Sequence, residues 1–205
     1  MVRAKITDIE RESSAEKVEQ ILQGAMQEFL AHGFAGTSMD RVAATAGVSK
    51  ATVYSHFTDK EGLFKALIER LARKKFHSIF GNEPLEGEPS QVLRQVGSKA
   101  LEQMREDQEH CAFMRVLIGE SARFPELAKV CVRAMMKPVF ETMSKYLASH
   151  PELKIADPEA VARIIVGSLV HFHITQDVLH GKDIISMEGD RILETMIDLI
   201  MKSAR

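Results

Sequence analysis

The sequence predicts an all-α protein of about nine helices, and three observations support this fold class. Apolar residues recur three and four positions apart along almost the whole 205-residue chain, which is the spacing of one helix face. Capping residues and Gly or Pro breaks divide these rows into segments of helical length. No segment alternates apolar and polar residues as a half-buried strand does. With 45% apolar and 27% charged residues, the chain has the composition of a globular protein with one large or two small domains.

The first helix is predicted to start at Ser13, which forms a capping box with Glu16. Residues 1–12 are polar and are expected to be flexible. They can be interpreted either as a simple tail or as an arm that enters a DNA minor groove. The helix should end at His32–Gly33. Its inward stripe is predicted to consist of Val18, Ile21, Leu22, Ala25, Met26 and Phe29.

The stretch from Ser38 to Phe57 predicts two short helices joined by a tight turn. Ser38 and Ser49 are good N-caps, because a serine hydroxyl accepts a hydrogen bond from the free N–H groups of a first helical turn. Gly47 stands where a helix often ends in a left-handed residue. In the second helix, Val53 and Phe57 are four residues apart and are expected to face inward.

This arrangement corresponds to the helix-turn-helix plan, in which the second helix enters the major groove of DNA. Lys50 can reach a phosphate or a guanine edge, and Ala51 is small enough to lie against a thymine methyl group. Thr52, Tyr54 and His56 can donate to phosphate oxygens. A helical hairpin with two ordinary caps is the alternative interpretation.

The same stretch resembles a known family. Residues 36–64 read GTSMDRVAATAGVSKATVYSHFTDKEGLF, which resembles the signature of the TetR-type repressors, and Phe29–Phe34 fits the end of that family's first helix. The resemblance covers about the first third of the chain and implies a DNA-binding domain. It implies DNA contacts by Lys50, Ala51, Thr52, Tyr54, Ser55 and His56, a phosphate contact by Lys60, and caps near the DNA backbone at Ser38 and Ser49.

Beyond this region a fourth helix is predicted from about Asp59 to Phe80, followed by a Gly- and Pro-rich loop over residues 81–89. We therefore expect a DNA-binding domain at residues 1–58, a connecting helix at 59–80 and a larger helical domain at 81–205. The remaining helices are predicted at residues 92–104, 111–123, 125–149, 157–180 and 186–202. Pro138 should kink the third of these, and Ser186 should cap the last.

The number and order of these helices fit the TetR-type architecture, and residues 119–128 resemble the branch that includes repressors of multidrug efflux pumps. The resemblance implies a homodimer built on a four-helix interface and a near-palindromic operator. The residues expected at that interface are Val161, Ile164, Ile165, Ser168, Leu169, Ile192, Met196, Ile197 and Ile200. Packing within the protomer core is the alternative for all of them.

The resemblance also implies a pocket for a small apolar effector in the larger domain. Methionine adapts to varied apolar ligands, and a few polar groups would orient them. The candidate lining residues are Met104, Phe113, Met114, Leu117, Met135, Phe140, Met143, His171, Phe172, Thr175 and Gln176. Ordinary core packing explains the apolar members of this set equally well.

Other functions receive little support from the sequence. The net charge of -2 shows no overall basicity, so charge alone does not indicate a nucleic-acid partner. No apolar segment is long enough to span a bilayer. No phosphate-binding glycine loop or nucleophile elbow is present, so no enzymatic activity, cofactor or metal is expected. His173, Asp177 and His180 share a helix face, but solvated side chains are the favoured interpretation. Cys111 and Cys131 could sense oxidants, although core packing is favoured.

The sequence therefore predicts a cytoplasmic, homodimeric transcriptional repressor released from DNA by a small apolar molecule. Two alternatives stay open: a regulator of the same fold that responds to oxidation or to a protein partner, and a helical interaction module that does not bind DNA.

Overall fold

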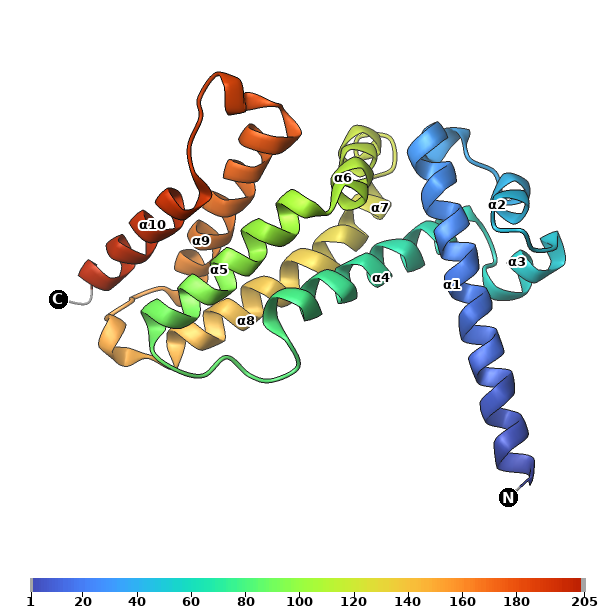
Figure 1. The fold of residues 1–205 in the computed structure, drawn as a ribbon, viewed down its shortest axis with the longest axis horizontal. Helices are drawn as coiled ribbons and strands as arrows, with labels where there is room; N and C mark the ends of the chain where they lie inside the picture. The colour runs from blue at the N-terminus through green and yellow to red at the C-terminus, as the bar shows by residue number, and fades with distance from the viewer. Residues whose placement is uncertain (1, 204–205) are drawn as a thin grey trace. The chain divides into compact units, whose positions relative to one another are not determined.

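The computed structural model describes residues 2–203, and the side chains of residues 14–202. Throughout this range the chain is helical, with no strand, which confirms the predicted all-α class (Figure 1). None of the described helices is both long and apolar enough to cross a membrane.

The chain folds into two compact units, each of which combines segments distant in sequence. The first unit comprises Met1–Leu71 with Ala112–Cys131, and the second comprises Ala72–Cys111 with Val132–Arg205. These groupings cut across the domain boundaries expected at residues 58 and 80, which stay a prediction.

The first unit contains a three-helix head. The head consists of α1 (Val2–Gly36), α2 (Met39–Thr45) and α3 (Lys50–His56), followed by the start of α4 (Lys60–Phe80). The unit also takes in most of α6 (Gln108–Glu120) and all of α7 (Pro125–Cys131). A cluster of aromatic rings forms much of its core: Phe29, Phe34, Phe64, Phe113 and Phe124.

The first helix begins earlier than predicted. Helix α1 runs through Ser13 from Val2, so Ser13 is not an N-cap and residues 2–12 are not an irregular arm. No Gly or Pro occurs between residue 2 and Gly24, so nothing in the sequence stops the helix from extending backwards. Any minor-groove contact by side chains of residues 1–12 lies outside the described side chains. The predicted end is confirmed, because Gly33 has a non-helical backbone with a positive φ of 66°.

Helices α1 and α2 approach each other closely at Gly24. A Cβ atom at this position would lie 2.8 Å from the Cβ and backbone nitrogen of Ala46. The side-chain amide of Gln20, one turn earlier, donates to the Ala46 carbonyl at 2.8 Å. Glycine on α1 therefore lets the end of α2 dock directly on the first helix.

The second unit packs α5 (Pro89–Glu106), α8 (Lys137–Ala148), α9 (Pro158–His173) and α10 (Gly189–Ser203) around one apolar core. Short 3-10 turns at Pro151–Leu153 and Gly181–Asp183 complete it. The fully buried members include Leu147, Leu153, Ala162 and Leu193. In Figure 1 the carboxyl-terminal α10 lies beside α9 and α5.

Two π-helical segments interrupt the helices of the second unit. The first, Val132–Met136, separates α7 from α8 immediately before Pro138, where the sequence predicts a disturbance. The cause is the missing N–H of proline, which cannot bond the carbonyl four residues back. The second, Ile174–Val178, ends the helix that begins at Pro158.

The segment between this second π turn and α10 differs from the prediction. The eighth helix was expected to reach His180, but His180 has a left-handed backbone with φ 58°. The last helix begins at Gly189, so Ser186 does not cap it. Gln176 explains part of the difference, because its amide bonds the backbone of both Ile185 and Met187 and holds this segment in an irregular path.

Candidate DNA-binding surface

Helices α2 and α3 form a helix-turn-helix whose two caps are as predicted. The Ser38 hydroxyl accepts from the Arg41 N–H at 3.3 Å, and the Ser49 hydroxyl accepts from the Thr52 N–H at 3.0 Å. Gly47 has φ 65° and forms the turn between them. Val53 is fully buried and anchors α3 from beneath.

The opposite face of α3 is polar and solvent-facing. Lys50, Ala51, Tyr54 and Ser55 are exposed, with Tyr54 at 53%, and Thr52 and His56 are half-buried. An exposed tyrosine on a seven-residue helix gains nothing from the protomer's own core. The face instead offers hydroxyl, imidazole and ammonium donors of the kinds that contact phosphates and base edges.

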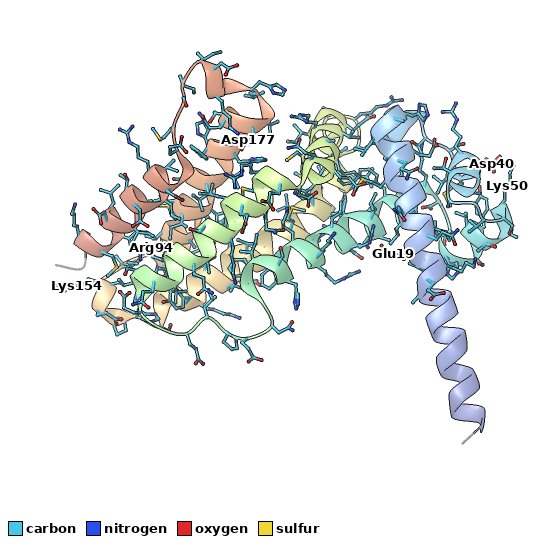
Figure 2. All side chains as sticks on the ribbon, in the orientation of Figure 1. Glu19, Asp40, Lys50, Arg94, Lys154 and Asp177 are labelled. Carbon is cyan, nitrogen blue, oxygen red and sulfur yellow. The ribbon has the colours of Figure 1, made fainter. Side chains whose placement is uncertain are left out.

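Lys50 is paired with a neighbouring carboxylate. Its ammonium lies 2.5 Å from the Asp40 carboxylate on α2, and both side chains are more than half exposed (Figure 2). Exposed pairs of this kind contribute at most about 1 kcal/mol, so a phosphate can replace Asp40 at little cost. No role was predicted for Asp40 from the sequence. Its carboxylate lies in the first turn of α2 and also interacts favourably with the positive end of that helix.

Lys60 has a structural role that the sequence did not predict. Its ammonium donates to the carbonyls of Ala35 and Thr37 at 3.2 and 2.8 Å and lies 4.6 Å from the centre of the Phe34 ring. Burial lowers the pKa of Lys60, partly offset by the Glu120 carboxylate. An ammonium has three donors, so one remains for the phosphate contact predicted for Lys60.

Helices α6 and α7 contribute to the same unit as the head. Glu120 at the end of α6 accepts from the Ala35 N–H at 3.4 Å. The Phe124 ring packs edge-on against Phe34 with centroids 4.6 Å apart, and Phe113 packs on Phe64 at 5.0 Å. Phe34 therefore contacts both Lys60 and the residue that precedes α7.

The chain was compared with known families, and two family models match it. The model described as bacterial regulatory proteins, tetR family, matches residues 21–67, which contain the helix-turn-helix. The model described as the AefR-like transcriptional repressor C-terminal domain matches residues 91–203, more than half of the chain.

The chain belongs to the TetR family of transcriptional regulators.

Individual TetR-family relatives match over almost the whole chain. The HTH-type transcriptional regulator YerO of Bacillus subtilis is 29% identical over 93% of this chain and 66% of its own length, and the repressor BepR of Brucella suis is 27% identical over 93% and 95%. The solved structure of the Flavonoid-responsive Regulator FrrA is 27% identical, with a TM-score of 0.76 over 92% of this chain and 97% of its own. As members of a family of transcription regulators, these proteins support the prediction that the chain is not an enzyme.

The predicted effector-binding residues of this TetR-family chain are divided between the two units. Phe113, Met114 and Leu117 lie in the first, where Phe113 and Leu117 are buried. The others lie in the second unit: Met104, Met135, Phe140, Met143, His171, Phe172, Thr175 and Gln176.

Several of these residues have structural partners that sequence could not show. Met143 is part of the second unit's apolar core, and the Thr175 hydroxyl donates to the carbonyls of His171 and Phe172. Gln176 is buried, and both ends of its amide are bonded to the backbone. Gln176 therefore stabilises the fold through these backbone hydrogen bonds. His171 is exposed to solvent.

The second unit does contain a cavity, of about 360 Å³, on a different set of residues. It lies between one face of α5, the π segment after α9 and the residues leading into α10. Of the predicted effector residues only Phe172 lines it, together with Leu101, Arg105, His173, Asp177 and Met187 among others. From the sequence, His173 and Asp177 were interpreted only as solvated or metal-binding side chains.

The predicted dimer residues also fall into two groups. Four of them are buried in the protomer's own core: Ile165, Leu169, Met196 and Ile197. For these four the structure favours the alternative of packing within the protomer core, and their place at a dimer interface stays a prediction. Ile164 is 62% exposed, and the remaining four are half-buried: Val161, Ser168, Ile192 and Ile200. Leu199, which is 66% exposed on α10, adds to the apolar surface of these helices.

Proposed function

We propose that this TetR-family regulator is a cytoplasmic homodimeric repressor that binds a near-palindromic operator and is released by a small apolar molecule. The exposed polar face of α3 carries the DNA part of the proposal. Its caps and turn fix the helix, Val53 anchors it, and Tyr54 points donors and ring surface toward solvent. A dimer of such heads reads two half-sites about one DNA turn, or a multiple of it, apart.

The dimer part of the proposal is supported by the exposed apolar residues of α9 and α10. Ile164 and Leu199 are each more than 60% exposed although large and apolar. Burying such side chains against a second copy would contribute about 1.5–3 kcal/mol each.

The effector part is supported by the relatives. The FrrA structure is named as flavonoid-responsive, and BepR is named as a repressor. We infer that the effector here is likewise a small, largely apolar compound. If effector binding weakens operator binding, linkage requires that operator weaken effector binding by the same factor.

A fluorescence-anisotropy titration of the purified protein against DNA flanking its own gene tests the proposal. Tyr54→Ala should weaken operator binding at least tenfold, with circular dichroism and urea midpoint unchanged. Lys145→Ala, which removes an exposed cation from α8, is the control and should have little effect. Lys60→Gln should weaken all sequences alike and flatten the salt dependence by about one charge.

The outcomes separate the proposal from its alternatives. Operator binding that a flavonoid or another apolar compound abolishes supports the full proposal. Tight binding that no such compound changes supports a regulator that responds to a different signal. Unchanged DNA affinity in Tyr54→Ala and Lys60→Gln would favour a helical interaction module.

A further inference from the structure

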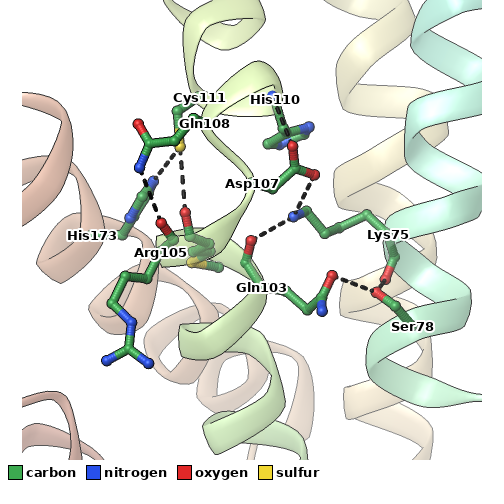
Figure 3. A network of polar contacts seen from close by, with 10 residues as sticks. Lys75, Ser78, Gln103, Arg105, Asp107, Gln108, His110, Cys111 and His173 are labelled. Carbon is green, nitrogen blue, oxygen red and sulfur yellow. Dashed lines mark hydrogen bonds and ion pairs between the residues drawn. The ribbon is translucent and has the colours of Figure 1, made fainter.

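Four side chains of the second unit form a linked chain that ends in a thiol. Cys111 Sγ lies 3.3 Å from His173 Nε2 (Figure 3). His173 Nδ1 lies 2.9 Å from Asp177 Oδ2. The other Asp177 oxygen is 2.5 Å from Lys182 Nζ. The order thiol, imidazole and carboxylate is that of a nucleophile, a base and a group that orients the base.

The carboxylate fixes which nitrogen of His173 carries its proton. Burial acts to raise the pKa of Asp177, but hydrogen bonds and charge from Lys182 and His173 outweigh it and hold the pKa below its ordinary value. An ionised carboxylate only accepts hydrogen bonds, so His173 Nδ1 carries the proton. In neutral His173 this leaves the Nε2 lone pair facing Cys111.

The thiol proton has at least two acceptors within reach. Cys111 Sγ is also 3.3 Å from the Met104 carbonyl, so the S–H bond can point to this oxygen or to His173 Nε2. The neighbouring residue His110 is influenced by Lys75, Asp107 and His173, and Lys75 contacts Asp107 at 3.1 Å. A backbone carbonyl is not a base, so of the Met104 carbonyl and His173 Nε2 only the imidazole can take up the thiol proton.

Cys131 provides an internal comparison. The two cysteines are equally buried, at 5% and 6% exposure. Burial raises the pKa of Cys131 to about 11, and desolvation is the only influence on it. A difference in alkylation rate between Cys111 and Cys131 would therefore result from the groups around each sulfur and not from the solvent exposure of the side chain.

The cavity of the second unit borders the His173–Asp177 end of this linked chain, whereas Cys111 is not among its lining residues. His173 and Asp177 both line it, and Leu101, Phe172 and Met187 supply apolar walls. The other charged groups that line the cavity are Arg105, Lys182, which is paired with Asp177, and the carboxylates of Glu102, Glu188 and Asp190.

We propose that Cys111, His173 and Asp177 form a nucleophilic thiol site that is alkylated by α,β-unsaturated carbonyl compounds. The sulfur bonds to the β-carbon of the reagent while the carbon–carbon π bond breaks and its electron pair moves toward the carbonyl as an enolate. The thiol proton passes to His173 Nε2 and from there to the α-carbon. The product is a thioether with a neutral ketone or aldehyde, and no oxidant or reductant is needed.

An adduct here would act on α6, an inference that rests on the proposed DNA-binding function. Cys111 is in the first turns of α6, and the same helix carries Phe113, which packs on Phe64, and Glu120, which bonds the Ala35 N–H. Enlarging residue 111 should shift the residues that follow it, which are packed in the same unit as the DNA-binding head.

The test measures alkylation of the full-length protein by N-ethylmaleimide and by 2-cyclohexen-1-one, with peptide mass spectrometry to assign each thiol. In the wild type, Cys111 should react at least tenfold faster than Cys131, a comparison that needs no variant. Its rate should depend less steeply on pH than that of Cys131, because His173 accepts the proton. In His173→Gln the rate should fall at least tenfold and should rise about tenfold per pH unit, as for an isolated thiol below its pKa.

Operator binding of the alkylated protein is measured separately, with Cys111→Ser and Cys131→Ser as matched variants. Alkylation should lower operator affinity at least tenfold in Cys131→Ser and should have no effect in Cys111→Ser. Equal rates at the two cysteines, or a wild-type rate that climbs tenfold per pH unit throughout, would overturn the thiol site. Rapid alkylation with unchanged operator affinity would overturn its regulatory role. Absence of operator binding before alkylation would count against the proposed function alone.

Discussion

The close approach of α1 and α2 at Gly24 allows a prediction with opposing contributions of known size. Gly24→Ala replaces a mid-helix glycine, which by helix propensity alone should stabilise the protein by about 1 kcal/mol. The new Cβ, however, would lie 2.8 Å from the Cβ and nitrogen of Ala46 and 3.0 Å from its Cα. These are backbone and first side-chain atoms, which cannot rotate away.

Forcing an extra methyl group into a packed contact costs about 1–3 kcal/mol, so the clash should exceed the gain in propensity. We expect a net loss of about 1–2 kcal/mol in the free energy of unfolding. Operator affinity should also fall, because Ala46 directly precedes the Gly47 turn that orients α3.

Urea denaturation and operator titration of the variant measure both effects. Gly119→Ala is the matched control, because a Cβ at that helical position has no atom within 4 Å. It should leave stability unchanged or raise it by about 0.4–1 kcal/mol. A Gly24→Ala protein as stable as the Gly119→Ala protein would show that α1 and α2 are not in the contact described.

Three further predictions follow from contacts of single residues. Burial and the nearby Lys75 lower the pKa of His110 to about 4. An unfolded histidine has a pKa near 6.5, so between these two values the unfolded state binds a proton that the folded state does not. The free energy of unfolding should therefore fall by about 2 kcal/mol between pH 7.5 and pH 5. Urea midpoints across that range should show this loss in the wild type and not in His110→Asn. Thr37→Val removes a buried hydroxyl that donates to the Gly33 and Glu28 carbonyls, and it should cost about 1 kcal/mol in the same assay. Asp40→Asn releases Lys50 and removes a negative charge beside α3, so it should strengthen operator binding several-fold at low salt. The lost ion pair and helix-end charge should lower the stability measured in urea by about 1 kcal/mol or less. Weaker binding would show that the ion pair positions Lys50 for DNA.

Local signals in the sequence predicted local structure well. The caps at Ser38 and Ser49 each accept the backbone hydrogen bond expected of them, and Gly47 has the positive φ expected at the end of a helix. The caps expected at Ser13 and Ser186 were wrong. The confirmed features depend on a few neighbouring residues, which is why spacing alone was enough. The helix-turn-helix and the polar face of α3 were predictable for the same reason.

Features that depend on distant partners were not predictable. Apolar spacing marks a helix face but does not say whether that face packs inside the protomer or against a partner, so Ile165 and Ile164 were placed in one group although the first is buried and the second exposed. The carbonyl contacts of Lys60 and the amide contacts of Gln176 join residues that only the folded chain brings together. The approach of Cys111 to His173 spans 62 positions and left no trace in the spacing of either residue.

The π segment at Ile174–Val178 has a consequence for how this part of the chain tolerates changes in length. A π turn contains one residue more than the α turn it replaces. Because the extra residue is accommodated within that turn, the side chains before and after it point in the directions that they would have without it. Deleting one residue within the segment would let the backbone return to α geometry without rotating the preceding helix, whereas a deletion in the middle of α9 would turn every later side chain by about 100°. Length variation between related proteins should therefore be tolerated here more readily than elsewhere in α9.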